Sequence, residues 1–299
     1  MAVKNVGSSY SRKMNKRRKA YQASLVRDKE AGSKPADPAD NNAGQTDRQV
    51  RLNKYLSDAG VCSRRQADRM VEEGRILVDG RPAVLGQKVN EDQEITVDGR
   101  PVAVQDKKVV LAYNKPIGIV CTAEKREKDN IIQAISYPIR IYPVGRLDKD
   151  SEGLILLTND GDLMNEILKA ANQHEKEYIV RVNRPVTNHF LKEMSQGVDI
   201  GDAVTAPCRL EKTGLKSFRI ILTQGLNRQI RRMCQALDYR VTGLRRIRVM
   251  NVKIGDLPLG EYREIRGEEL YELYYRTGVK PHFPLPCEAP DKDRPILKA

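Results

Sequence analysis

The stretch 145–162, GRLDKDSEGLILLTNDGD, places the acids Asp148, Asp150 and Glu152 among the bases Arg146 and Lys149 and then continues as an apolar run. Three kinds of site have this composition: a calcium loop, a solvated surface loop, and a catalytic carboxylate held beside cations. A carboxylate kept ionised by a neighbouring cation can act as a nucleophile or as a general base. The choice among these three decides what chemistry the protein can do.

The calcium interpretation fails on the residues that follow the acids. A calcium loop of the EF-hand type needs a bidentate Glu at its twelfth position, and that position here is Asn159. The run LILLT after Gly153 predicts a buried strand rather than a helix, and Arg146 and Lys149 would repel a cation. A solvated loop is harder to separate from a catalytic one. We expect Leu147 to point into the protein, and two apolar strands to fix the loop ends, which suits a positioned side chain.

A second group of charges lies in QGLNRQIRRMC, residues 224–234. Asn227 is predicted to cap a helix whose inner face is Ile230, Met233, Cys234 and Leu237. Arg228, Arg231 and Arg232 then lie off that face in the first turns, where cations oppose the helix macrodipole. This placement suggests an anionic partner, either a phosphate or a carboxylate. Three solvated arginines are the alternative.

The overall charge points to a polyanionic partner. The 299 residues include 53 Lys and Arg against 40 Asp and Glu, a formal net charge of +13, and nucleic acid is the commonest partner of such a chain. A membrane surface would require a basic amphipathic helix or a lipid anchor, and neither is seen. No apolar stretch approaches the roughly 20 residues of a membrane span. Five scattered cysteines without a C-x-x-C pair argue against a disulfide framework or a zinc site and favour a reducing, cytoplasmic setting.

The two ends of the chain are expected to be irregular. Residues 1–50 begin with seven Lys or Arg and no acid in the first twenty positions, and the stretch that follows is too polar to form a core. We interpret this tail as a non-specific contact to RNA phosphates; a transit peptide and a passive solubilising tail are the alternatives. Residues 277–299 are rich in proline.

Residues 51–99 predict a small domain of two helices followed by a short sheet. Apolar residues at positions 52, 55, 56 and 59 share one helix face, and Ser63 followed by Gln66 predicts the start of the second helix. Asp79-Gly80 and Asp98-Gly99 predict tight turns after two strands. Cations beside the helices have few acids to pair with, which favours a nucleic-acid-binding face over a solvated one. These cations are Arg51, Lys54, Arg64, Arg65, Arg69 and Arg75.

Residues 100–108 are interpreted as a linker and residues 109–276 as the catalytic domain. Strand patterns are VVLAYNKP, RIYPV, LILLT, EYIVRV, SFRIILT and RRIRVMNVKI, and helix patterns are DLMNEILKA, PVTNHFLKEMSQG and NRQIRRMCQALD. The second of these helices is predicted to begin at its proline. The mixture indicates an α+β fold with a large, mainly antiparallel sheet flanked by helices.

These motifs resemble the bacterial ribosomal RNA pseudouridine synthases. GRLDKDSEGLILLTNDGDL is similar to the family pattern G-R-L-D-x-x-[ST]-x-G-L-[LI]-[LI]-[LF]-T-N-D-G, HEKEYIVRV to its K-x-Y-x-V motif, and GLNRQIRRMC to its third motif. NKPIGIVCT is similar to the strand that leads the domain. Residues 51–99 resemble the alpha-L RNA-binding domain of a small-subunit ribosomal protein. The resemblance covers residues 51–275 and, among subtypes, is closest to the large-subunit type F enzymes.

The resemblance implies a cofactor-free isomerisation of one uridine in ribosomal RNA, with the 23S RNA of the large subunit as the expected substrate. The N1–C1′ bond breaks, the base turns, and C5 joins C1′, after the base has been flipped out of the RNA. The match assigns the catalytic aspartate to Asp148 and its partner to Arg231. It makes Tyr178 the residue that stacks on the flipped uracil and a candidate proton-transfer group, and Arg146 the residue that fills the vacated space.

Several points stay open on the sequence alone. Further RNA contacts are expected from arginines that could equally be solvated, namely Arg228, Arg232, Arg245, Arg246 and Arg248. The alternatives to the enzyme are a catalytically inert RNA-binding ribosome-assembly factor and a metal-dependent nucleic-acid hydrolase, although only one acidic loop is found. Transfer RNA is an alternative or additional substrate. We expect a monomer with no metal and no membrane partner.

Overall fold

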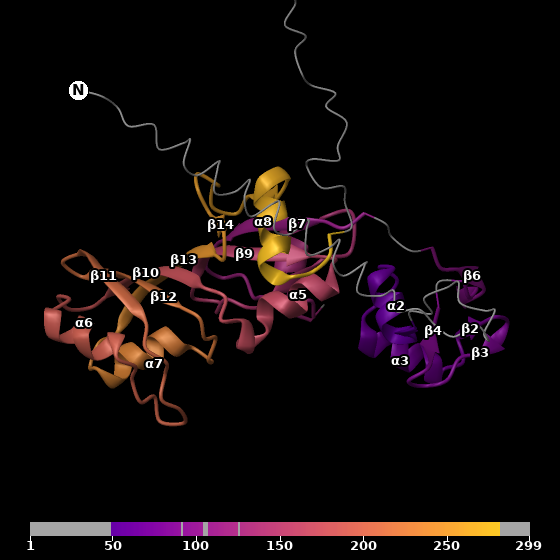
Figure 1. Cartoon of the computed structure of the whole chain (residues 1–299), viewed down its shortest axis with the longest axis horizontal. Helices are drawn as coiled ribbons and strands as arrows, with labels where there is room; N and C mark the ends of the chain where they lie inside the picture. Colours follow the sequence, from indigo (N-terminus) through magenta and orange to yellow (C-terminus); the bar gives the residue numbers. More distant parts are fainter. Residues whose placement is uncertain (1–48, 91, 104–106, 125, 282–299) are drawn as a thin grey trace, which may run out of the picture. The chain divides into compact units, whose positions relative to one another are not determined.

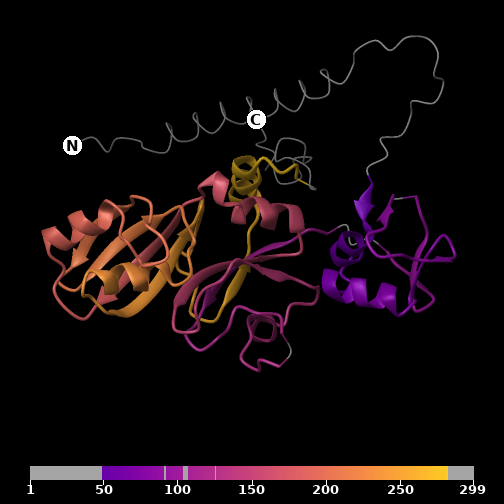
Figure 2. The ribbon, with the colours of Figure 1, turned by 90° about the horizontal axis from the view of Figure 1, so that it is seen from below.

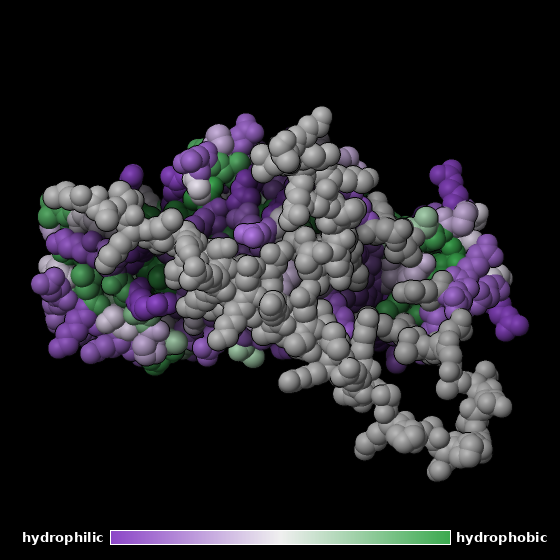
Figure 3. Space-filling view, turned by 45° about the horizontal axis from the view of Figure 1, so that its top comes forward, coloured by the Kyte–Doolittle hydropathy of each residue, from purple (hydrophilic) through white to green (hydrophobic). Residues whose placement is uncertain are grey.

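The computed structural model describes residues 49–90, 92–103, 107–124 and 126–281. The predicted basic tail, except for its last two residues, and most of the predicted C-terminal tail lie outside these ranges. None of the helices in the described part is both long and apolar enough to cross a membrane. Hydrophilic side chains, drawn in purple, cover much of the visible described surface in Figure 3.

The N-terminal domain surrounds one small apolar core. Its helices are α2 (Leu52–Asp58) and α3 (Arg64–Glu72), and its strands are β1 (Val50–Arg51), β2 (Ile76–Val78), β3 (Arg81–Pro82), β4 (Lys88–Val89), β5 (Ile95–Val97) and β6 (Arg100–Pro101). β1 pairs with β4, and a four-stranded sheet follows the order β3-β2-β5-β6. The core contains the predicted inner faces of both helices, including Leu52, Leu56, Ala67, Met70 and Val71.

Local signals in this domain act as predicted. The Ser63 hydroxyl accepts a hydrogen bond from the Gln66 backbone N–H at 3.2 Å and caps α3. Asp79 and Gly80 have φ angles of +50° and +74°, which allows the tight reversal between β2 and β3. The second hairpin runs on through β6, so Arg100 and Pro101, which the sequence suggested as the start of the linker, belong to the sheet.

The C-terminal domain is built on a nine-stranded sheet with the main order β11-β12-β10-β13-β9-β7-β15; β8 also pairs with β9, and β14 with β13. The strands are β7 (Val110–Lys115), β8 (Tyr142–Val144), β9 (Glu152–Thr158), β10 (Lys176–Val182), β11 (Arg209–Gly214), β12 (Ser217–Leu222), β13 (Val241–Val249), β14 (Val252–Lys253) and β15 (Tyr262–Glu264). All described pairs in this sheet are antiparallel except β9 with β13. The predicted α+β fold with a mainly antiparallel sheet is confirmed.

Helices cover both faces of the central strands. They are α4 (Ile131–Ile135), α5 (Gly161–Leu168) and α8 (Gly267–Thr277), whereas α6 (Asn188–Ser195) and α7 (Gln229–Ala236) pack on another part of the sheet. Ala112 and Leu156 pack with residues of α5 and α8, whereas Leu111 and Leu157 pack with residues of α4. Figure 2 shows α5 and α8 on one side of these strands and α4 on the other. β7 and β9 are therefore buried on both faces, which explains their continuous apolar runs.

A separate core forms under α6 and α7. Phe190 and Met194 of α6, and Met233 and Cys234 of α7, pack with Phe218 and other apolar residues of β10, β12 and β13. Figure 1 shows both helices beside this part of the sheet. The inner face predicted for α7 is therefore the face that packs.

Three sequence predictions differ from the structure at the ends of elements. α6 begins after Thr187, whose hydroxyl accepts the Phe190 N–H at 3.1 Å, rather than at Pro185. α7 begins after Arg228, which has a left-handed backbone with a φ of +47°, so Asn227 is not its cap. The strand predicted over RRIRVMNVKI is a hairpin of β13 and β14 that turns at Met250, where φ is +53°.

Candidate active site

Asp148 lies in the loop between β8 and β9, and both ends of this loop are paired into the sheet. Leu147 points inward as predicted: it is 8% exposed, and its N–H donates to the Cys121 Sγ at 3.4 Å. The Ser151 N–H donates to the Asp148 carbonyl at 3.1 Å and closes a turn. The loop therefore holds Asp148 rigidly, while 29% of its side chain stays exposed.

Two arginines from the start of α7 approach this loop. Arg228 Nη1 lies 3.4 Å and Arg231 Nε 3.6 Å from Asp148 Oδ2. The closer contacts of Arg231 go to its neighbours: its Nη2 donates to the Asp150 carbonyl at 2.9 Å and to the Ser151 hydroxyl at 3.1 Å. Among the described residues no donor makes a hydrogen bond to the Asp148 carboxylate, although two positive charges lie within 4 Å of it. Its oxygens are thus held near cations and remain open to a substrate.

Asp150 is the acid that the two arginines bind more closely. Arg228 Nη2 lies 3.1 Å and Arg231 Nη2 lies 3.2 Å from its Oδ2. Partial burial by itself would raise the pKa of Asp150, but the hydrogen bond from Arg228 and the charges of both guanidinium groups outweigh it and hold the pKa below its usual value. Asp150 therefore anchors Arg228 and Arg231 beside Asp148.

Asp148 opens onto a pocket of about 770 Å³. Arg146 and Asp148 line it from the β8–β9 loop, and the segment 222–230 lines it from the β12–α7 connection. Tyr178 of β10 contributes an aromatic side chain to the same pocket. Three of the residues that the motif resemblance assigned to the reaction, Arg146, Asp148 and Tyr178, thus meet at one cavity, whereas Arg231 approaches Asp148 without being among the described residues that line it.

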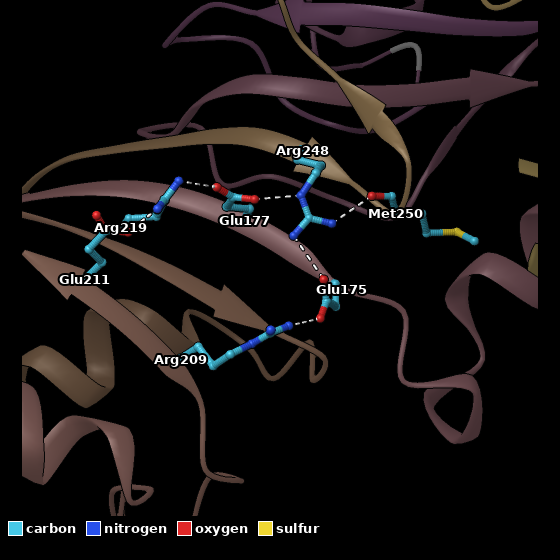
Figure 4. Close-up of polar contacts among 7 residues, drawn as sticks. All are labelled: Glu175, Glu177, Arg209, Glu211, Arg219, Arg248 and Met250. Atoms are coloured by element: carbon cyan, nitrogen blue, oxygen red, sulfur yellow. Dashed lines mark hydrogen bonds and ion pairs between the residues drawn. The ribbon is translucent and has the colours of Figure 1, made fainter. Parts of the chain in front are cut away.

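β10 presents alternate residues to its two faces. Lys176 and Tyr178 line the pocket, whereas Glu175 and Glu177 bind arginines instead. Arg248 of β13 donates through Nε to Glu177 at 2.6 Å and through Nη2 to Glu175 at 3.0 Å (Figure 4).

This ion network stabilises the strand pair next to Tyr178. The β10–β13 register shifts between Glu177 and Tyr178, so the pairing is irregular at the point where the tyrosine enters the pocket. Arg248 also donates through Nη1 to the Met250 carbonyl at 2.7 Å, which ties the β13–β14 turn to the same network (Figure 4). Arg219 of β12 pairs with Glu177 at 3.4 Å from the other neighbouring strand.

The remaining predicted RNA contacts fall into two groups. Arg51, Arg64, Arg65 and Arg69 are exposed on the N-terminal domain, and Arg146 and Arg245 are exposed on the C-terminal domain. Others already bind acids: Lys54 pairs with Asp58 at 2.7 Å, Arg75 with Asp98 at 2.7 Å, and Arg232 with Asp202. The six cations of the N-terminal domain therefore have more acidic partners than the sequence suggested.

Sequence reasoning missed a set of basic residues that line the pocket. Arg246, expected as a solvated side chain or a phosphate contact, is 4% exposed and lines the pocket together with Lys176 and His174. Alternation along β10 could have identified Lys176, because it lies two residues before Tyr178 and so on the same face. No equivalent signal marks Arg246, since four arginines occur between positions 240 and 248.

Comparison with known proteins shows which family has this fold and this set of motifs. A family model described as RNA pseudouridylate synthase matches residues 109–236, and an S4 domain model matches residues 50–95. The dual-specificity RNA pseudouridine synthase RluF of Salmonella typhi is 49% identical over 77% of this chain and 80% of the relative. The chain belongs to the RNA pseudouridine synthase family. RluF of Escherichia coli (strain K12) is 45% identical to this pseudouridine synthase over 84% of the chain and 89% of the relative.

More distant relatives show the same family. The ribosomal large subunit pseudouridine synthase B of Bacillus subtilis (strain 168) is 32% identical over 75% of this chain and 95% of the relative. A crystal structure of a pseudouridylate synthase superposes with a TM-score of 0.56 at 26% identity, covering 76% of this chain and 99% of that one. The family resemblance, the enzymatic activity and the RNA-binding N-terminal domain inferred from the motifs are confirmed. This favours the enzyme over an inert assembly factor and over a metal-dependent hydrolase.

Proposed function

We propose that this pseudouridine synthase isomerises a specific uridine of large-subunit ribosomal RNA and that it also accepts a second RNA, with transfer RNA as the candidate. The relatives called RluF carry the description dual-specificity, and the Bacillus subtilis relative is named for the large ribosomal subunit. The observation that supports the reaction is that the Asp148 carboxylate lies within 4 Å of Arg228 and Arg231 and lines a pocket together with Tyr178.

Each of these side chains suits one part of the reaction. Asp148 acts at the ribose, either by attacking C1′ or by taking the proton from C2′, because it is the acid whose oxygens stay free beside two cations. Arg231 holds the loop through Asp150 and Ser151 while its Nε faces Asp148. Tyr178 stacks on the flipped uracil, since an aromatic ring offers a flat apolar face with a polar tip.

Base flipping has to be stabilised at the rim of the pocket. Arg146 is exposed and lines the pocket two residues before Asp148, so we assign it to the space that the uracil leaves in the RNA. Arg228, 44% exposed, extends the basic rim toward the RNA backbone, whereas Arg232 is paired with Asp202 and is not among the described residues that line the pocket. The exposed arginines at positions 51, 64, 65 and 69, together with Lys54, supply electrostatic contacts from the N-terminal domain. We expect the enzyme to act as a monomer in the cytoplasm, and light scattering of the purified protein tests the first point.

The reaction is tested by replacing the acid at its centre. Isomerisation removes the hydrogen at C5 of uracil, so RNA labelled with tritium at that position reports turnover by release of tritium into water. Asp148→Asn is expected to reduce release to background, while RNA affinity stays nearly unchanged, because the variant keeps the shape of the side chain. Asp256→Asn, a change of the same kind at an exposed position, is the control. Full activity of Asp148→Asn would refute the assignment.

The RNA substrate is tested separately. Ribosomal RNA of each subunit and bulk transfer RNA, each prepared without modifications, would be offered to the wild-type enzyme, and the converted uridine mapped. Conversion in large-subunit RNA alone would remove the second substrate from the proposal. Conversion only in small-subunit RNA would overturn the choice of subunit.

A further inference from the structure

Arg246, which is buried, and Lys176, which is half-buried, line the pocket without an acidic partner among the described residues. We call Arg246 and Lys176 the basic floor of the pocket. Arg246 is 4% exposed, and its Nε donates to the Leu154 carbonyl at 2.6 Å. Its Nη2 is buried and has no hydrogen-bond partner among the described residues. Neither cation forms an ion pair with a described acid, so the floor has a positive charge that the described part of the protein does not neutralise.

Lys176 is half-buried and has one polar partner among the described residues. Its ammonium donates to the His174 carbonyl at 3.3 Å, a long hydrogen bond to a neutral group. Burial lowers the pKa of Lys176, and the charge of Arg246 lowers it further. His174 also lines the pocket, and its buried Nε2 has no partner within the described part of the chain. Burial lowers the pKa of His174 as well, and Lys176 adds to this, which keeps the ring neutral and able to donate or accept a hydrogen bond.

The nearby Lys115 shows what a structural buried lysine looks like in this domain. It is 0% exposed, and its ammonium donates to the Pro116 carbonyl at 2.9 Å and to the Ile119 carbonyl at 2.8 Å. Those short contacts compensate its burial. Unpaired buried donors are costly and are usually satisfied by a ligand, an ion or water. The difference between Lys115 and the floor indicates that the floor is completed by the substrate.

The position of the floor selects which part of the RNA it meets. The Arg246 guanidinium carbon lies over the Tyr178 ring, 6.0 Å from its centroid, so it is close to any base that stacks on that ring. A phosphodiester group belongs to a chain that must enter and leave the pocket, and exposed cations such as Arg146 and Arg228 suit it better. Uracil has two carbonyl oxygens, O2 and O4, that a buried donor beside the tyrosine can bind.

We propose that Arg246 and Lys176 bind the carbonyl oxygens of the target uracil and stabilise the negative charge that the base acquires when its bond to the ribose breaks. This inference rests on the proposed function. In that step both electrons of the N1–C1′ bond remain on N1 and spread to O2 and O4. C1′ either forms a new bond to the Asp148 carboxylate or, when Asp148 takes the C2′ proton, forms a double bond to C2′ with the electrons of the former C2′–H bond. The base is then an anion in contact with two cations.

The charge on the base persists until it turns. When C5 attacks C1′, either the C1′–O bond to Asp148 breaks and its electrons return to the carboxylate, or Asp148 returns its proton to C2′ and the electrons of the C1′–C2′ double bond form the new C2′–H bond. The negative charge of the base is consumed in the new C–C bond, and loss of the C5 proton with protonation of N1 gives the neutral product. Fixed donors aimed at developing charge give large effects in a water-poor site, typically about 10²-fold to 10³-fold for one donor. Removing the positive charge at position 246 should therefore slow bond cleavage by about 10²-fold while leaving RNA affinity nearly unchanged.

The test compares two leaving groups. Fluorine at C5 makes uracil a better anion, so cleavage of 5-fluorouridine depends less on the floor. Single-turnover rates would be measured on one RNA with uridine or 5-fluorouridine at the target position, by chromatography and mass spectrometry of the digested nucleosides. The variants are Arg246→Gln, Arg246→Lys and Lys176→Gln. Arg240→Gln is the matched control, because it makes the same change at an exposed arginine directly before the same strand.

The expected result is a loss of about 10²-fold for Arg246→Gln on uridine, a loss several-fold smaller on 5-fluorouridine, and partial rescue by Arg246→Lys. Equal losses of cleavage rate on uridine and 5-fluorouridine would overturn the proposal. A fall in RNA affinity, with the slope of log affinity against log salt reduced by about 0.7, would also overturn it, because that change indicates a phosphate contact. If Arg246→Gln does not fold, the same comparison of rate losses on uridine and 5-fluorouridine is made with Arg246→Lys and Lys176→Gln. Failure of the proposed function itself would appear differently, as wild-type enzyme without turnover or as active Asp148→Asn.

Discussion

Replacing Gly153 by alanine should damage both stability and activity, because two strands approach each other too closely there for a side chain. Gly153 is at the start of β9, opposite Arg246 of β13, and has a φ of +105°. A Cβ at this position would lie 2.2 Å from the Arg246 carbonyl oxygen and 2.8 Å from its nitrogen. Ordinary contact begins at 3.4 Å, so the backbones would have to separate by about 1.2 Å.

The size of the effect follows from two costs. A non-glycine residue in such a backbone conformation costs about 1–3 kcal/mol, and insertion of an atom into a packed region costs about 1–3 kcal/mol more. For a domain of this size each kcal/mol lowers the melting temperature by roughly 2–4 °C, so a decrease of about 10 °C is expected. A displacement of about 1 Å at a reacting group can reduce turnover by about 10²-fold, and this one moves the Asp148 loop relative to Arg246.

Thermal unfolding and tritium release would be measured on Gly153→Ala beside Gly201→Ala. Gly201 has a similar φ of +95° but nothing within 4 Å of the added Cβ, so it isolates the backbone cost from the steric one. We expect Gly201→Ala to lose only the backbone part and to retain full activity. If the two variants were equally stable and equally active, the close approach of β9 and β13 would have no energetic importance, and the reasoning would be wrong.

Two further outcomes follow from the ion network and from the N-terminal domain. Arg248→Met should destabilise the protein by about 3 kcal/mol in urea unfolding, because it leaves Glu177, 9% exposed, without its main partner. The double variant that also carries Glu177→Leu should recover part of this loss of stability. If it recovered none, the two side chains would not be coupled. Changing Arg64, Arg65 and Arg69 together to Gln should lower the slope of log affinity against log salt by about 0.7 for each single-strand phosphate that these side chains neutralise, and an unchanged slope would exclude these arginines from RNA binding.

Signals that depend on a few consecutive residues predicted the structure well. Ser63 could cap a helix, and Asp79-Gly80 could form a tight turn, whatever surrounded them, since each relies on its own backbone and nearest neighbours. The buried strands β7 and β9 were also evident, because a continuous apolar run without helical spacing suits a strand covered on both faces.

The sequence predictions that failed concern features that depend on contacts between residues far apart in the chain. The turn at Met250 depends on the Arg248 guanidinium, which binds the Met250 carbonyl while its other nitrogens bind Glu175 and Glu177. Nothing within RRIRVMNVKI predicts that network, since its acids are on or just before β10. The burial of Arg246 likewise results from the packing of β13 against β9 and β10. For the site, the motif resemblance assigned Asp148, Tyr178 and Arg231, and these roles stay predictions, whereas the basic floor became apparent only from the packing of three strands.

The double covering of β7 and β9 has a consequence for how the enzyme meets its substrate. Asp148 lies in the loop that leads into β9. This strand cannot shift without disturbing two apolar layers, one under α5 and α8 and the other under α4. The carboxylate that we propose as the reaction centre is therefore fixed and does not adapt to the incoming RNA, so the deformation needed for binding falls on the nucleic acid. Uridines that are already loosely stacked or poorly paired should therefore be modified fastest. Selectivity among sites would then depend on how easily the RNA deforms as much as on its sequence.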